Sequence, residues 1–129
     1  MGANRAHYQH LQVLKDQLVL ITAELTGAGA ADMTNAESAD FGGGEVSAAT
    51  RTGAGKFTLT FRKKYPQLKA GMAPLVVGTT DGLVAQFASI DLSAGTAALE
   101  TYVGSTPTDP ASTDTIYLCL IARNSGRNT

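Results

Sequence analysis

The chain has 129 residues, which fits a single domain with a modest hydrophobic core. Its formal net charge of −1 gives no overall attraction to nucleic acid or to an anionic membrane. No stretch approaches the roughly 18–20 apolar residues that span a bilayer, and a single cysteine excludes an internal disulfide framework. Residues 1–12, MGANRAHYQHLQ, lack the apolar centre of a secretion signal, so we expect synthesis in a reducing interior.

Residues 1–17 are expected to form an N-terminal segment outside the main domain. Leu11, Leu14 and Leu18 have helical spacing, so this segment is either a short helix or an extended arm. From residue 18 to residue 129 we expect one β domain. Its first strand, in QLVLITAELTG, alternates between two faces, one of which is drier. Residues 27–44 are small, polar and glycine-rich, and we expect a long surface loop.

A hairpin is predicted where EVSAATRT and KFTLTF flank Gly53-Ala54-Gly55. The second of these strands should turn three residues towards the core, namely Phe57, Leu59 and Phe61. Residues 62–74, RKKYPQLKAGMAP, are expected to be a connection.

The C-terminal half contains further strand patterns. The pair Asp81-Gly82, between PLVVGTT and LVAQFASI, predicts a second hairpin. TAALETYVG is another strand, and STPTDPASTD is a turn-rich loop. TIYLCLIA is apolar on both faces, which favours a central strand covered on both sides. Together these patterns predict an all-β fold, a single-domain β-sandwich or small β-barrel of about seven strands.

The charged residues are segregated along the sequence. Residues 16–45 carry only acidic charges, residues 51–69 only basic ones, and residues 81–114 only acidic ones. Either folding interleaves these blocks on adjacent strands, or they form surface patches of opposite sign that suit self-association or docking on another protein.

The segment Gly53-Ala54-Gly55-Lys56 superficially matches a phosphate-binding loop. That motif needs a glycine at position 50, where this chain has Thr50, and a Ser or Thr hydroxyl at position 57, where it has Phe57. A strand pattern follows where the motif needs a helix, so we expect no nucleotide site and interpret the glycines as a hairpin turn.

No set of residues predicts catalysis or metal binding. His7 and His10 are the only histidines and have no third ligand nearby, so they are interpreted as polar surface residues. Asp109 and Asp114 lie in a turn-rich loop, where capping of turns explains them. Cys119 lies in the most apolar run of the chain and is interpreted as a small buried hydrophobic residue. We therefore expect no enzyme, no cofactor and no small-molecule substrate.

The segment FRKKYP places Arg62, Lys63 and Lys64 between two aromatic residues. Such a cluster can bind nucleic acid, but this one is short and most of the chain's other charges are acidic. A solvated turn or a protein-docking patch fits better.

The run EVSAATRTGAGKFTLTFRKKYPQL and the later TPTDPASTDTIYLCLIARNS resemble β-rich accessory virion proteins of tailed bacteriophages. The likeness covers roughly residues 45–125 and consists of turns and strands. It implies a virion component on the capsid surface, made in the cytoplasm of the host bacterium and assembled as a homo-oligomer, often a homotrimer.

These observations lead to a hypothesis of function. We expect a capsid decoration (cement) protein that binds the major capsid protein, with no nucleic-acid or membrane partner. The expected partner-binding residues are His7, Tyr8, His10, Leu11, Arg62, Lys63 and Lys64. The alternative is a receptor- or glycan-binding module of a phage head or tail fibre, which would use the loops at residues 27–44 and 104–114.

Overall fold

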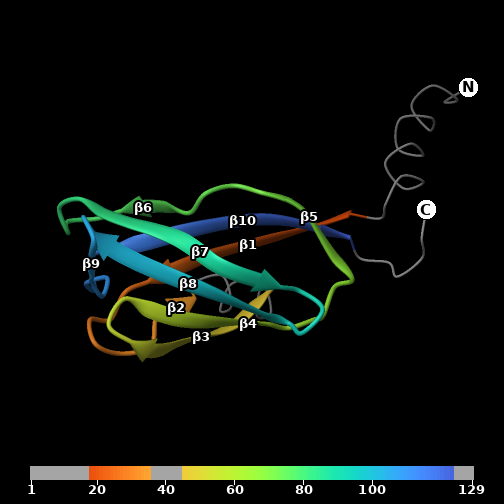
Figure 1. Cartoon of the computed structure of the whole chain (residues 1–129), viewed down its shortest axis with the longest axis horizontal. Coiled ribbons are helices and arrows are strands. Elements are labelled where there is room, and N and C mark those ends of the chain that lie inside the picture. Colours follow the sequence, from red (N-terminus) through yellow and green to blue (C-terminus); the bar gives the residue numbers. More distant parts are fainter. Residues whose placement is uncertain (1–17, 36–44, 124–129) are drawn as a thin grey trace, which may run out of the picture.

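The computed structural model describes residues 18–35 and 45–123. Two antiparallel sheets of five strands each pack face to face as a β-sandwich, which confirms the all-β prediction and decides for the sandwich (Figure 1). The arm or helix expected at residues 1–17, and residues 36–44 of the predicted loop, lie outside the described part of the chain.

The first sheet is centred on β10 (Thr115–Arg123). β1 (Leu18–Thr26) pairs antiparallel with β10 along its whole length, with Leu18 opposite Arg123 and Thr26 opposite Thr115. β2 (Thr34–Asn35) extends the sheet beyond β1. On the other side of β10, β5 (Gln67–Gly71) pairs with its end and β6 (Leu75–Val77) pairs with its start.

The second sheet is built from hairpins. β3 (Val46–Gly53) pairs with β4 (Lys56–Phe61), and β4 pairs with β8 (Thr96–Val103). β7 (Leu83–Asp91) pairs with the other edge of β8. β9 (Thr106–Pro107) pairs with the end of β8, on the same edge as β4. The predicted hairpin at Gly53-Ala54-Gly55 is confirmed.

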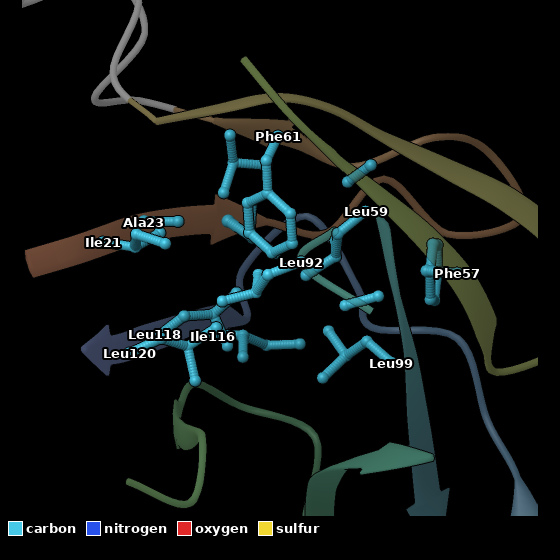
Figure 2. Packing of buried hydrophobic residues seen from close by; sticks show 14 of the residues in the cluster. Ile21, Ala23, Phe57, Leu59, Phe61, Leu92, Leu99, Ile116, Leu118 and Leu120 are labelled. Carbon is cyan, nitrogen blue, oxygen red and sulfur yellow. The ribbon is translucent and has the colours of Figure 1, made fainter. Parts of the chain in front are cut away.

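The core lies between the sheets, as the alternation of apolar residues predicts. The first sheet contributes Ile21 and Ala23 from β1, and Leu118 from β10; Phe57 and Leu59 of β4 face them (Figure 2). Each of these five side chains is at most 4% exposed. The three β4 residues predicted to face the core are all buried.

One prediction of strand pairing is wrong. Residues 75–77 and 83–90 do not form a hairpin: β6 pairs with β10 in the first sheet, whereas β7 pairs with β8 in the second. Asp81-Gly82 still forms a turn, with a φ of +73° at Gly82, but the chain crosses there from one sheet to the other. A dipeptide that favours a turn determines the local backbone conformation, but it does not determine which strand the next strand pairs with.

Residues 18–35 and 45–123 form ten strands, where about seven are expected for the chain. The additional ones are β2, β5 and β9, all inside predicted loops or connections. The segment at 27–35 also contributes Met33, which is 5% exposed and forms a bridge with Ala49 of β3. These short strands show no clear alternation of apolar and polar residues in the sequence. Each is held in its sheet by backbone pairing with a longer strand, namely β1, β10 or β8.

Candidate functional site

Of the residues expected to bind a partner, only Arg62, Lys63 and Lys64 lie in the described part of the chain; His7, Tyr8, His10 and Leu11 lie outside it. The three basic side chains are exposed on the connection from β4 to β5, which crosses between the sheets. We call Arg62–Lys64 the basic turn. It lies at the end of the sandwich where β1 begins and β10 ends (Figure 1).

Backbone hydrogen bonds hold the basic turn in place on both sides. The amide of Phe61 donates to the carbonyl of Gly95 at 2.9 Å, and the amide of Arg62 donates to the carbonyl of Glu45 at 2.8 Å. After the turn, the amide of Tyr65 donates to the carbonyl of Leu92 at 2.9 Å. The basic turn is therefore fixed to the start of β3 and to the loop between β7 and β8.

Tyr65 anchors the same turn from inside. Its side chain is 2% exposed, and its hydroxyl donates to a carboxylate oxygen of Glu45. Burial and this hydrogen bond raise the pKa of Tyr65 to about 12, because both disfavour the phenolate. The aromatic residue that follows the basic run is thus a core anchor, and the three charged side chains before it point to solvent.

Two other basic residues of the same block are interleaved with acidic ones. Arg51 on β3 forms a two-point ion pair with Asp109: its Nε and Nη2 donate at 3.0 and 2.9 Å. Lys56 on β4 lies opposite Glu100 on β8. Interleaving therefore accounts for these charges, whereas the basic turn keeps three like charges together on the surface.

The Gly53-Ala54-Gly55 turn is held by Asp109. Gly55 has a φ of +65°, and its amide donates to Asp109 Oδ1 at 2.8 Å. A Cβ at Gly55 would lie 2.5 Å from the carbonyl oxygen of Thr101, so only glycine fits. The hydrogen bonds from Arg51 outweigh partial burial and, with the Gly55 amide, lower the pKa of Asp109.

Asp114 joins two loops at the end of the sandwich where β10 begins, the loop after β6 and the loop after β9. It is fully buried and accepts hydrogen bonds from the amides of Thr79, Thr80 and Ala111 at 2.8, 3.0 and 2.8 Å, and from the Thr80 hydroxyl. Burial alone would raise the pKa of Asp114, but these hydrogen bonds outweigh it and the pKa is lowered. Asp114 thus caps a turn of its own loop, as predicted. Asp109 holds a different turn from the one in which it lies, namely that of Gly55.

The interpretation of Cys119 as buried is wrong. Leu118 and Leu120 face the core, so Cys119 faces outwards between them and is half-buried. The run TIYLCLIA is central in its sheet, as predicted, but its second face is covered by no other layer in the described part of the chain.

That second face carries most of the large exposed apolar side chains. We call it the outer face of the first sheet. It is lined by Leu18 and Leu20 of β1, Tyr117, Cys119 and Ile121 of β10, and Met72, Leu75 and Val77 beside β10. Leu20 is 57% exposed and Leu75 is 60% exposed. Monomeric proteins rarely leave such a continuous apolar area to water.

No protein-family model, curated protein or solved structure matches this chain. Function must therefore be argued from the two surfaces described above. In the described residues, no three or more His, Cys, Asp and Glu side chains gather where they could hold a metal ion. The same residues contain no helix long and apolar enough to cross a membrane.

Sequence reasoning found the basic turn but missed the outer face of the first sheet. A strand that is apolar on both faces has the same pattern whether one face or both are covered. The signal that could have distinguished the two cases is in β1, where Leu18 and Leu20 occupy the face opposite Ile21 and Ala23.

Proposed function

We propose that this protein is a bacteriophage capsid decoration protein that binds the outer surface of the major capsid lattice and stabilises the head. The observation that carries the proposal is the basic turn, three consecutive basic residues exposed on a backbone that is hydrogen-bonded on both sides. A turn already held in one conformation loses little entropy on docking. Its positive charge would direct it to an acidic surface.

The rest of the molecule supports binding in preference to catalysis. Asp109 and Asp114 are engaged in holding turns and an ion pair, so these carboxylates have a structural role. The exposed apolar side chains are suited to contact with protein. The resemblance to accessory virion proteins, over residues 45–125, makes a capsid the proposed partner.

The proposed mechanism is multivalent. Several copies, each with a modest contact through the basic turn and the N-terminal arm, would bind neighbouring capsid subunits together. Because binding would depend partly on exposed charges, its affinity should fall as the salt concentration rises.

Co-sedimentation with empty capsids tests the charge contribution. We expect Lys63→Gln/Lys64→Gln to lower capsid occupancy at physiological salt. Thr50→Glu/Thr60→Glu is the control, because it changes the net charge equally at exposed positions on the second sheet. Equal occupancy of both variants and the unmodified protein would refute the role of the basic turn. Deletion of residues 1–14 without loss of occupancy would refute that of the arm.

One observation favours a second candidate, a receptor- or glycan-binding module of a fibre. The structure brings the loops proposed for that role together: the amide of Gly27 donates to the carbonyl of Asp114, and that of Gly29 to the carbonyl of Pro110. Immunogold labelling of purified particles separates the two proposals. Label all over the head supports decoration, whereas label only on fibres or tail supports the module.

A further inference from the structure

We propose that two copies of this chain associate through the outer face of the first sheet, related by a two-fold axis that sets their strands antiparallel. In this contact, Glu24 of each copy lies against Arg123 of the other. The contact goes beyond the proposed function and does not depend on a capsid.

The first argument is the apolar strip on this face. Its centre is β10, where Tyr117, Cys119 and Ile121 follow one another on the outward side. Leu20 of β1 lies opposite Ile121, and Leu75 of β6 lies opposite Tyr117. Apolar side chains therefore extend across three neighbouring strands, as on the inner face of a sheet that packs against another sheet.

The second argument is that the two ends of the strip carry opposite charges. Glu24 lies opposite Tyr117 at one end, and Arg123 lies opposite Leu18 at the other. Lys69, in the bulge of β5, lies towards the Arg123 end. The strip thus has one acidic and one basic end, about 20 Å apart given six residues at roughly 3.3 Å each.

The third argument is that neither charge is paired within the described residues. In that part of the chain, the Glu24 carboxylate has no ion pair or hydrogen bond. The Nε of Arg123 is buried and has no hydrogen-bond partner there. A second copy cannot reach this nitrogen, but Arg123 as a whole is only half-buried and no ion pair in the described residues neutralises it. Its charge is therefore available to a carboxylate from another chain.

These features select one of the two symmetric ways to pack the faces. With the two-fold axis parallel to the strands, Glu24 would meet Glu24, and Arg123 would meet Arg123. With the axis in the plane of the interface and perpendicular to the strands, each acidic end meets a basic end. Packed sheets lie about 10 Å apart, a gap that a Glu and an Arg side chain can bridge together.

The register also sets small side chains of one copy against large ones of the other near the axis. The midpoint between the Leu18–Arg123 pair and the Glu24–Tyr117 pair is the Ile21–Leu120 pair. Thr22 and Cys119 lie one position from the axis on one side, and Leu20 and Ile121 lie one position from it on the other, so each small pair faces a large pair of the second copy. Because the chain has one cysteine, Cys119 is a natural probe of this interface.

Sedimentation equilibrium of the full-length chain over a range of concentrations tests the proposal. We expect a reversible dimer. Glu24→Arg and Arg123→Glu alone should each weaken it at least tenfold, because each creates two like-charge contacts. An equimolar mixture of the two variants should recover association, since every contact then joins opposite charges across the interface.

Gln86→Arg is the control, since this exposed residue lies on the edge strand β7 of the second sheet, and it should leave the dimer unchanged. Circular dichroism verifies that each variant is folded. Leu20→Glu gives a second test, because a charge in the apolar strip should abolish the dimer whatever Arg123 contributes to folding.

The reaction rate of Cys119 with a thiol reagent gives an independent measurement. The rate should fall as protein concentration rises through the dimerisation range, and in Leu20→Glu it should be fast at all concentrations. Three results would overturn the proposal. One is a trimer. Another is a monomer at every concentration with Cys119 protected, which would indicate that residues 1–17 cover the face. The last is failure of the mixed variants to associate better than either alone.

Discussion

Replacement of Asp114 by asparagine should cost more stability than any other single-atom change among the described acidic residues. In the native protein Oδ1 accepts from the amides of Thr79 and Thr80, and Oδ2 accepts from the amide of Ala111 and the Thr80 hydroxyl. An asparagine keeps one accepting oxygen. Its NH₂ group cannot accept from Ala111, so the amide of Ala111 loses the acceptor that the fully buried Asp114 carboxylate supplies.

The magnitude follows from the number of bonds lost. A hydrogen bond to a charged group contributes about 1.5–3 kcal/mol, and a buried donor left without an acceptor costs about 1–3 kcal/mol. With one or two of the four bonds lost, we expect Asp114→Asn to lower the free energy of unfolding by about 3 kcal/mol. For a domain of this size that corresponds to a fall in Tm of about 10 °C.

Urea unfolding followed by far-UV circular dichroism measures the difference. Asp81→Asn is the matched control, because Asp81 is exposed in the turn next to Thr80. We expect that control to change stability by less than about 0.5 kcal/mol. If the two variants unfolded at the same urea concentration with the same slope, the assigned role of Asp114 would be wrong.

The same residue predicts a pH dependence. The pKa of Asp114 is lowered in the folded protein, so its stabilising effect is complete above the ordinary aspartate pKa of about 4. That effect should be lost as the pH falls below about 4 towards the folded-state value, since the unfolded chain takes up the proton more readily. Asp114→Asn should flatten this part of the curve of stability against pH, leaving the contribution of the other carboxylates.

Two further predictions concern the turns at the two ends of the sandwich. Gly55→Ala should lower the free energy of unfolding by about 3 kcal/mol or more, because the added Cβ would lie 2.5 Å from the Thr101 carbonyl oxygen. Gly29→Ala is the control: Gly29 has a similar φ of +64° but no atom within 4 Å of its Cβ, so the loss should be only about 1 kcal/mol. Equal losses in a melting experiment would contradict the steric argument. Tyr65→Phe should cost about 1.5 kcal/mol by removing the hydrogen bond to Glu45, and in an ultraviolet titration it should remove the tyrosine with a pKa of about 12. Because that pKa is raised, the stabilisation is complete below pH about 10 and is lost as the pH rises through about 12. Tyr102, whose pKa is also raised by its hydrogen bond to Glu100, should still titrate late in the variant. A late-titrating absorbance change as large as that of the unmodified protein would therefore refute the assignment.

The candidate site was only partly visible in the sequence. Arg62–Lys64 is a contiguous run, and its exposure between two strands follows from local pattern. The anchoring of the run does not, because the carbonyl groups that hold it belong to Glu45, Leu92 and Gly95, which are distant in sequence. The outer face of the first sheet combines residues of β1, β6 and β10, and no local sequence pattern indicates that they share one surface.

The sequence by itself determined which residues of β4 face the core and where the chain turns at Gly55, because side-chain alternation and a positive φ are local properties of the backbone. The tertiary structure decided which strands pair. It placed β6 beside β10 instead of β7, and it left Cys119 on a face that no other layer of the described residues covers. The physical reason is that a strand's hydrogen-bonding groups accept any neighbour, so the pairing is set by which arrangement buries the most apolar surface across the whole chain.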